Sequence, residues 1–220
     1  QYVPPEIVAE LSTQSEKINL EGESKYMTVL FCDLQNFSGV SEQMSPRELV
    51  KMLNDYFNEL TMILYKYGAT IDKYIGDSIM TFWSAPVTQE DHTRRAVLAS
   101  FEMQKAVEKL SDIYVGNGWP EQTMGIGINT GMMNVGNMGS RYRLAYTVIG
   151  DAVNLSSRLQ TMTRVYKVPT ICGEETAKNV KDIEFMELDT VQVRGKKIIS
   201  RIYHPVGLKS EISDSKKHLL

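Results

Sequence analysis

Two aspartates stand where strand-like segments end, and together they could hold a cation. Asp33 interrupts the run VLFCDLQNF at residues 29–37, directly after a segment of large apolar residues. Asp77 follows Gly76 between the strand-like runs ATIDKYI and SIMTFW, so we expect it at the tip of a tight hairpin. An unpaired, partly buried carboxylate destabilises a fold unless a positive group meets it. Taken singly, each acid is more simply explained as a turn residue, but if the two strands lie side by side, the carboxylates meet and form a site suited to hard divalent cations.

A second group of polar residues follows the tripeptide IGD, which occurs at residues 75–77 and again at 149–151. The second copy opens a helix-like segment, so we expect Asp151 to cap that helix and assign it no chemistry. Asn154 and Arg158 lie four residues apart on a face turned roughly 90° from the expected buried stripe. Side chains placed in this way are usually only solvated, although they can also act together on one ligand.

Other motifs give weaker signals or exclude a class of protein. The segment GIGINTG has the spacing GxGxxxG and lies within or between strands instead of opening a helix, so we reject a dinucleotide-binding interpretation. No GxxxxGK[ST] motif is present, which excludes the P-loop NTPases. The residues RGKK at 194–197 are typical of a hairpin turn with exposed cations, although a lysine there can also contact a phosphate.

Composition indicates one globular domain with short extensions. The 220 residues are 42% hydrophobic and 23% charged, and 24 basic residues nearly balance 27 acidic ones, with no basic block of the kind that binds nucleic acid. Cys32 and Cys172 lie far apart, which argues against a disulfide framework and favours a reducing compartment. The apolar runs are too short to cross a bilayer, and the absence of an initiator Met suggests a fragment of a longer chain, so any membrane contact is expected upstream of residue 1.

The periodicity predicts a core of strand, helix, strand, strand, helix and strand. These elements are expected at residues 26–32, 45–67, 69–75, 78–83, 90–110 and in the segment that begins at 124. For the first helix, Ser45 and Glu48 form a capping box, Pro46 suits the first turn and Gly68 marks the end. This order is that of the ferredoxin-like split βαβ arrangement, so we predict an α/β fold, an α+β sandwich with a βαββαβ core.

Further elements are expected beyond that core. We interpret MGIGINTGMMNVGNMG as two strands around Thr130 and Gly131, and RLAYTVI as another strand that leads into a helix at 152–162. A short strand in VYKVPTIC, a helix near 174–180 and the hairpin LDTVQVRGKKIISRIY complete the far side of the sheet. The expected buried stripes of the three long helices are Leu49, Leu53, Tyr56, Leu60, Ile63 and Tyr67; Ala96, Ala99, Met103, Val107 and Leu110; and Ala152, Leu155, Leu159 and Met162.

Three segments together, VLFCDLQNFS, DKYIGDSIMTFW and YTVIGDAVNLSSRLQ, resemble the signatures of class III nucleotidyl cyclase catalytic domains. The three motifs in this order are far more specific than any one of them. The resemblance implies the class III cyclase fold and an activity most like that of bacterial adenylyl cyclases, which convert ATP to 3′,5′-cyclic AMP and pyrophosphate. It also implies a linker or docking segment at 1–24, a catalytic domain at 25–206 and a polar tail at 207–220.

The resemblance assigns a role to each matching residue. Asp33 and Asp77 would bind two Mg²⁺ or Mn²⁺ ions, with the backbone carbonyl of Leu34 as a further ligand. Lys73 would donate to a ring nitrogen of adenine, and Thr147 would accept from the exocyclic amine. Guanylyl cyclases tend to carry Glu and Cys at these two positions, so the pair favours ATP. Many adenylyl cyclases have Asp in place of the threonine, although bacterial members with Thr are familiar, so the selectivity for ATP is expected to be looser here.

The remaining implied residues contact the ribose and the phosphates. Asn154 would orient the ribose, and Arg158 would stabilise charge on the phosphoryl group in transfer. The rest of the expected substrate-binding set is Lys196, which would contact the phosphates, with Arg143, Phe37 and Ser38.

In this family the two halves of one site come from different chains. This chain carries both the acids and the residues that contact base, ribose and phosphate, so the resemblance implies a head-to-tail homodimer with two equivalent sites. A cytoplasmic location is expected for the catalytic domain, and our hypothesis for the parent protein is that it is anchored in a membrane. The alternatives are a guanylyl cyclase and a non-catalytic, nucleotide-sensing dimerisation module, while a diguanylate cyclase would show GG(D/E)EF where YIGDS stands.

Overall fold

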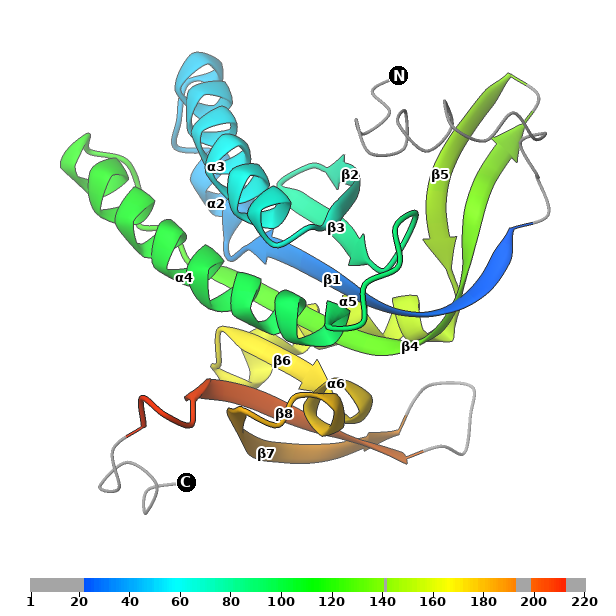
Figure 1. Cartoon of the computed structure of the whole chain (residues 1–220). Coiled ribbons are helices and arrows are strands. Elements are labelled where there is room, and N and C mark those ends of the chain that lie inside the picture. The colour runs from blue at the N-terminus through cyan, green and yellow to red at the C-terminus, as the bar shows by residue number, and fades with distance from the viewer. Residues whose placement is uncertain (1–21, 141, 193–198, 213–220) are drawn as a thin grey trace.

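One mixed sheet organises the chain, of which the computed structural model describes residues 22–140, 142–192 and 199–212. Within these residues, eight strands join in the order β2-β3-β1-β4-β6-β8-β7, with β5 paired to the second half of β4 (Figure 1). The strands are β1 (Glu23–Leu34), β2 (Thr70–Ile75), β3 (Ser78–Trp83), β4 (Met124–Ser140), β5 (Arg143–Ile149), β6 (Thr170–Gly173), β7 (Ile183–Gln192) and β8 (Ile199–Leu208). The helices are α2 (Phe37–Ser41), α3 (Pro46–Lys66), α4 (His92–Gly116), α5 (Asp151–Tyr166) and α6 (Glu174–Asn179).

The core has the predicted ferredoxin-like topology. β1 lies between β3 and β4 and is antiparallel to both, while β2 pairs with the outer side of β3. The connection from β1 through α3 to β2 therefore leaves room for β3 between two strands that run the same way, which is the split βαβ unit. The predicted α+β fold and its βαββαβ order are confirmed.

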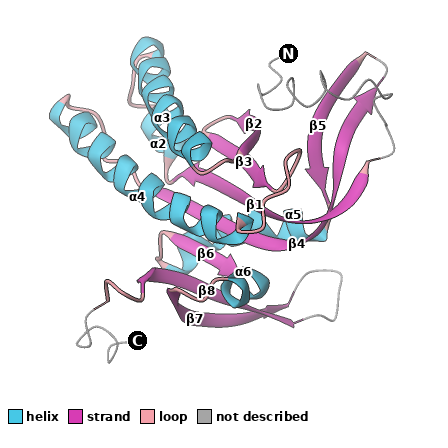
Figure 2. Cartoon of the chain, viewed as in Figure 1, coloured by secondary structure: helices cyan, strands magenta, loops and turns pink. Residues whose placement is uncertain are grey.

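Helices cover both faces of this sheet, α3 and α4 on one and α5 on the other (Figure 2). Side chains of β1 alternate between the two faces, as a pleated strand requires. Leu30 and Cys32 pack with the helices α3 and α4, whereas Met27 and Val29 pack with Val153 of α5. From Met27 onward both faces of β1 are largely buried, so the residues from Met27 to Cys32 are apolar except Thr28, and Asp33 follows them.

Helix α3 begins and ends as the sequence predicts. The Ser45 hydroxyl accepts from the Glu48 N–H at 3.4 Å, and the Glu48 carboxylate accepts from the Ser45 N–H at 2.9 Å. Pro46 occupies the first turn, and Gly68 follows the helix with a φ of +72°. The expected stripe is largely right, although Leu49, Leu53 and Tyr67 are only partly buried and the fully buried Met52 and Leu64 belong to it as well. In α4 the expected inward residues are buried except Leu110, which is half-buried, and the helix continues to Gly116.

The prediction of two strands around Thr130 and Gly131 is wrong, because β4 is one continuous strand of 17 residues. At the expected turn, Thr130 pairs with Thr28 and Gly131 with Met27, both within the ladder to β1. The first half of β4 continues the sheet toward β6, and the second half pairs with β5.

The glycines of β4 allow α5 to pack very closely on the sheet. A Cβ at Gly127 would lie 2.2 Å from the backbone oxygen of Ser156 and 2.3 Å from the backbone nitrogen of Gln160. The Ser156 hydroxyl, buried at this contact, donates to the carbonyls of Gly127 and Val29 at 2.9 and 3.1 Å. The glycines that suggested a nucleotide loop or a turn therefore serve helix packing.

Close packing also corrects the predicted orientation of α5. Its buried residues are Val153, Ser156, Leu159, Gln160 and Thr163, whereas Ala152, Leu155 and Met162 of the expected stripe are only partly buried. The helix presents small and polar side chains to the glycines, so an apolar periodicity does not reveal its inner face. Asp151 is not the cap, because the N-cap residue is Gly150 and Asp151 lies in the first turn.

The other predicted elements are present, although β7 and β8 extend beyond the predicted hairpin. Strands β6, β7 and β8 and helix α6 form the far side of the sheet, and Cys32 and Cys172 are both buried free thiols. The short helix α2 after β1 was not predicted, and residues 193–198, which include Lys196, lie outside the described residues. Across the described ranges, none of the helices has the length and apolar character needed to traverse a bilayer.

The contact between α5 and β4 makes a prediction about stability. Gly127→Ala is expected to lower the free energy of unfolding by about 2–3 kcal/mol, because the new methyl group meets helix backbone that cannot move aside. Urea unfolding followed by circular dichroism measures the change. Gly116→Ala is the control, since nothing lies within 4 Å of a Cβ there, and it should change stability by no more than about 1 kcal/mol. A Gly127→Ala protein as stable as the Gly116→Ala protein would contradict the packing argument.

Candidate active site

The two predicted acids do meet. Asp33 lies at the end of β1, and the turn between β2 and β3 places Asp77 beside it, because β3 pairs with β1 up to the partners Cys32 and Ile79. Two hydrogen bonds tie the acids to each other's strands. The Leu34 N–H donates to Asp77 Oδ2 at 3.2 Å, and the Ser78 hydroxyl donates to Asp33 Oδ1 at 2.5 Å.

The proximity of these carboxylates has an electrostatic consequence. Burial, followed by the hydrogen bond and the negative charge of Asp33, raises the pKa of Asp77 to about 6. A carboxyl group next to another carboxylate resists ionisation unless a positive charge arrives. The acid pair is therefore a place where a cation lowers the energy of the folded chain.

Arg164 supplies a positive charge at this place, and the sequence did not predict it. One guanidinium nitrogen, Nη2, donates at 3.3 Å to Asp33 Oδ2 and at 3.3 Å to the carbonyl oxygen of Leu34. A carboxylate oxygen and a backbone carbonyl thus face one point in space, which is the arrangement that a cation uses. In the sequence, Arg164 is recognisable only as a basic residue in the last turn of a helix, where a positive charge is favourable. It lies 131 positions from Asp33, so no local pattern predicts their contact.

Lys73 and Thr147 also come together, and with them a residue that was not predicted, Asp72. The Lys73 ammonium donates to the Thr147 hydroxyl at 3.3 Å, and that hydroxyl donates to Asp72 Oδ2 at 2.5 Å. The register of β2 against β3 shifts between Ile71 and Lys73, so Asp72 occupies a β-bulge. We call Asp72, Lys73 and Thr147 the β2–β5 cluster, after the strands that carry them.

Asn154 and Arg158 project from the exposed face of α5, as predicted. Across the described ranges, neither side chain forms a hydrogen bond or ion pair, so neither contacts the acid pair or the β2–β5 cluster in this way. The site residues of one chain therefore fall into separate groups. Of the other predicted residues, Phe37 is half-buried at the start of α2, whereas Ser38 and Arg143 are exposed.

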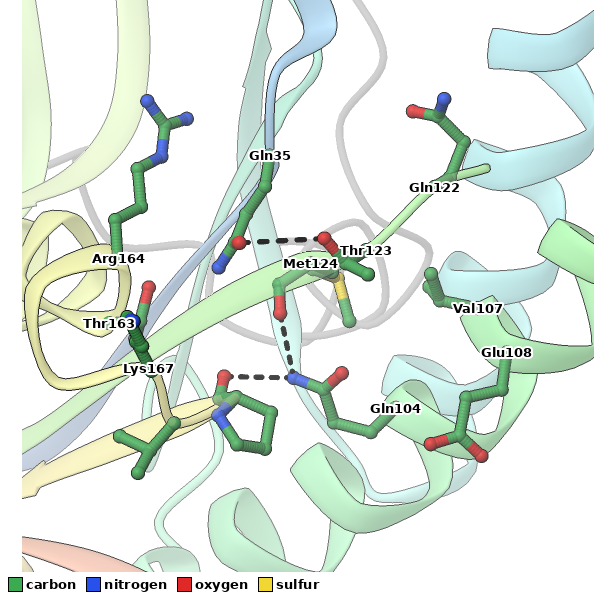
Figure 3. Close-up of a pocket in the computed structure, with 12 residues that line it drawn as sticks. Gln35, Gln104, Val107, Glu108, Gln122, Thr123, Met124, Thr163, Arg164 and Lys167 are labelled. Carbon is green, nitrogen blue, oxygen red and sulfur yellow. Dashed lines mark hydrogen bonds between the residues drawn. The ribbon is translucent and has the colours of Figure 1, made fainter. Parts of the chain in front are cut away.

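A cavity of about 340 Å³ is lined in part by Gln35 and by Arg164, the residue that contacts Asp33 (Figure 3). Gln104 forms part of its wall and donates to the backbone oxygens of Met124 and Pro169 at 3.1 and 2.9 Å. Figure 3 shows the Arg164 guanidinium pointing away from Gln104. Because its lining includes neither acid nor any member of the β2–β5 cluster, we do not assign the chemistry to this cavity.

The fold is that of a nucleotidyl cyclase domain, with a ferredoxin-like core that carries the acid pair where β1 and the turn between β2 and β3 meet. Residues 21–204 match the family described as the adenylate and guanylate cyclase catalytic domain, and the chain belongs to this family. The resemblance drawn from the three motifs is thereby confirmed.

Curated relatives include adenylate cyclases from bacteria. Adenylate cyclase 1 of Rhizobium meliloti is 31% identical over 94% of this chain, and the adenylate cyclase of Anabaena cylindrica is 34% identical over 92% of it. The matched segment spans 31% and 41% of the length of these two relatives.

Two solved structures with the same fold are named for different substrates, one as an adenylyl cyclase and one as a guanylyl cyclase. The adenylyl cyclase CyaB from P. aeruginosa matches 88% of this chain and all of its own chain, with a TM-score of 0.81 and 34% identity. The guanylyl cyclase Cya2 matches 88% of this chain and 98% of its own, with a TM-score of 0.79 and 34% identity.

The raised pKa of Asp77 makes a prediction about stability and pH. Because the folded-state pKa of about 6 lies above the ordinary value of 3.8, ionisation of Asp77 destabilises the fold as pH rises through this interval. In the absence of divalent cations, Asp77→Asn should therefore be more stable than the parent chain by about 1–2 kcal/mol near pH 7.5, a value reduced for partial exposure, and equally stable near pH 4.

Urea unfolding at both pH values measures this difference. The control is Asp112→Asn on the exposed side of α4, which should change stability by less than about 0.5 kcal/mol at either pH. If Asp77→Asn were no more stable than the parent chain near pH 7.5, burial and the neighbouring Asp33 would not disfavour the ionised form of Asp77 as the structure indicates.

Proposed function

We propose that this chain is an adenylyl cyclase that converts ATP to 3′,5′-cyclic AMP and pyrophosphate. Overall similarity cannot choose the base, because an adenylyl cyclase and a guanylyl cyclase match the chain equally well at 34% identity. The single observation that carries the choice is the contact of the Lys73 ammonium with the Thr147 hydroxyl at 3.3 Å.

This contact suits adenine. Adenine presents a ring nitrogen that accepts a hydrogen bond next to an exocyclic amine that donates one. Lys73, whose side chain is 43% exposed, is a donor that can reach the ring nitrogen, and the adjacent Thr147 oxygen can accept from the amine. Guanine presents a donor at the ring nitrogen and an acceptor at the exocyclic position, so the same pair fits it less well.

The acid pair is the proposed binding site for two divalent cations, Mg²⁺ or Mn²⁺. Its donors are hard oxygens of Asp33, Asp77 and the Leu34 carbonyl, and Arg164 already places a positive group against two of these residues. Across the described ranges, no group of three or more His, Cys, Asp or Glu side chains gathers, so phosphate oxygens of the substrate would complete the coordination. When bound, the ions would neutralise the phosphates and lower the pKa of the ribose 3′-hydroxyl.

The other residues position the substrate. The reaction is an intramolecular attack of the 3′-hydroxyl on the α-phosphorus, so it depends on holding the ribose in line with the departing pyrophosphate. Asn154 would orient the ribose, and the exposed Arg158 guanidinium would donate to the phosphoryl oxygens as charge develops on them. Lys196, Arg143, Phe37 and Ser38 remain proposed substrate contacts, and residues 25–206 the proposed catalytic domain.

The separation of the site residues supports a head-to-tail homodimer. Neither Asn154 nor Arg158 contacts the acid pair within the described part of the chain, yet one reaction needs both groups. Large apolar side chains are exposed on the strands near the acids and the β2–β5 cluster, as a partner subunit would require: Tyr74, Ile75, Met132 and Ile149. Two equivalent sites would then form, each with acids from one chain and Asn154 and Arg158 from the other. Because ATP is the proposed substrate, we also propose a cytoplasmic location for this domain.

Product analysis tests the proposed reaction. Incubation of the chain at high concentration with Mn²⁺ and ATP should yield cyclic AMP and pyrophosphate in equal amounts, with a specific activity that falls on dilution as dimers dissociate. Asp33→Ala is the inactive control. Absence of both products would favour a non-catalytic nucleotide-sensing module, and faster formation of cyclic GMP from GTP would favour a guanylyl cyclase.

Mixing two inactive variants tests whether sites are shared. Asp33→Ala and Arg158→Ala should each lose activity by about 10³-fold or more. After subunit exchange, about half of the dimers are mixed and each carries one intact site, so about a quarter of the parent activity should return. Asp33→Ala mixed with Asp77→Ala is the matched control and should recover nothing, because both lesions fall in the same half-site. Failure of the first mixture to recover under proven exchange would refute shared sites.

A further inference from the structure

Asp72 is an acid on β2, the edge strand of the sheet, yet its side chain is buried. Its side chain has no exposed surface, and one carboxylate oxygen, Oδ2, accepts from the Thr147 hydroxyl. The other, Oδ1, lies 3.1 Å from the Lys73 ammonium, which balances the charge, but among the described residues it has no donor aligned for a hydrogen bond. Burial of an acid costs free energy even when a cation balances its charge, so the presence of Asp72 here points to a task that a neutral residue cannot perform.

The role of Asp72 follows from the hydrogen-bonding capacity of the Thr147 hydroxyl. A threonine hydroxyl has one hydrogen to donate and two lone pairs that accept. In this chain the hydrogen of Thr147 is directed at Asp72, and one lone pair faces Lys73. The hydroxyl therefore has only a lone pair left for a third partner, and it can meet that partner only as an acceptor.

We propose that Asp72 is a specificity-determining residue, which acts through Thr147 by fixing its hydroxyl as a hydrogen-bond acceptor. This inference rests on the proposed function, in which Thr147 meets position 6 of the purine. An acceptor there matches the amine of adenine and opposes the carbonyl oxygen of guanine or hypoxanthine. Without Asp72 the hydroxyl could rotate and donate to a carbonyl, so threonine alone would not discriminate between the two.

The sharpest variant is Asp72→Asn, because Lys73 sets the orientation of the new amide. The ammonium near Oδ1 favours the amide oxygen on its side, which turns the amide nitrogen toward Thr147. The nitrogen donates to the hydroxyl oxygen and frees the hydroxyl hydrogen for the base. The substitution preserves size and shape and reverses only the direction of this hydrogen bond.

Inosine triphosphate is the appropriate competitor of ATP, because it differs only in the carbonyl at position 6 and the proton on the adjacent ring nitrogen. The ratio of kcat/KM for the two nucleotides, measured in one preparation, does not depend on how much protein is folded. We expect Asp72→Asn to lower the preference for ATP by at least about tenfold. Thr147→Val should lower it similarly, and the double variant should lower it no further, because Asp72 acts only through that hydroxyl.

Asp112→Asn is the control acid substitution, and its preference should equal that of the parent chain. The proposal would be overturned if the preference of Asp72→Asn for ATP stayed within about twofold of the parent value, or if the double variant lost more of that preference than either single variant.

If Asp72→Asn does not fold, the parent chain can be tested with purine riboside triphosphate, which has no group at position 6. If Thr147 acts as an acceptor, kcat/KM should fall in the order ATP, purine riboside triphosphate, inosine triphosphate. A higher kcat/KM for inosine triphosphate than for purine riboside triphosphate would reject the proposal.

Equilibrium competition by 3′-deoxy-ATP and 3′-deoxy-ITP separates this proposal from the proposed reaction. Both lack the attacking hydroxyl, so they report the base preference without turnover. A chain that forms no cyclic AMP but binds the adenine analogue better, in a manner that depends on Asp72, would reject the reaction and retain the role of Asp72. Equal binding of both analogues would reject that role whatever the activity.

Discussion

Two carboxylates held together against their mutual repulsion are the constraint on which the rest of this structure depends. Asp33 and Asp77 belong to separate strands, and the negative charge of one contributes to the raised pKa of the other. They stay together because the ladder between β1 and β3 is rigid and because Leu34 and Ser78 donate hydrogen bonds across it. The apolar core around β1, covered by helices on both faces, supplies the free energy that opposes the repulsion. The site is thus destabilised locally and supported by the packing behind it.

Helix α5 links the separate parts of the site, and its distance from the sheet is set by glycine. Because a side chain at Gly127 would collide with the helix backbone, only glycine lets α5 lie where it does. Its last turn then brings Arg164 within 3.3 Å of Asp33, while its outer face presents Asn154 and Arg158 to solvent. A shift of this helix would move the cation at the acids and the residues proposed for the partner's site together. The packing of α5 on the sheet therefore also determines the geometry of the site.

Sequence reasoning succeeded where the deciding signal is local and failed where it is not. The hairpin at Asp77, the capping box of α3 and the strand that ends at Asp33 each depend on residues within a few positions, and each was predicted. The partners Arg164 and Asp72 act across 131 and 75 positions, and no short pattern reports such contacts. The glycines of β4 were misread as a turn because a glycine needed for helix packing and one needed for a turn look the same in a sequence. The inner face of α5 was predicted incorrectly because several of its buried residues are small or polar and do not form an apolar stripe.

The choice of substrate base in this fold depends on the direction of a few hydrogen bonds, and overall shape does not decide it. An adenylyl and a guanylyl cyclase superimpose on the chain almost equally well, so the backbone accommodates either activity. A lysine selects a ring-nitrogen acceptor because it can only donate, whereas a threonine can donate or accept and so carries no information by itself. The threonine becomes selective when a neighbouring group fixes its hydroxyl as either a donor or an acceptor. In the role proposed for Asp72, a buried acid next to Thr147 does this, so that a residue which does not touch the base determines which base is accepted. On that proposal a threonine at position 147 does not loosen the selectivity for ATP, because the acid that fixes its hydroxyl is present in β2.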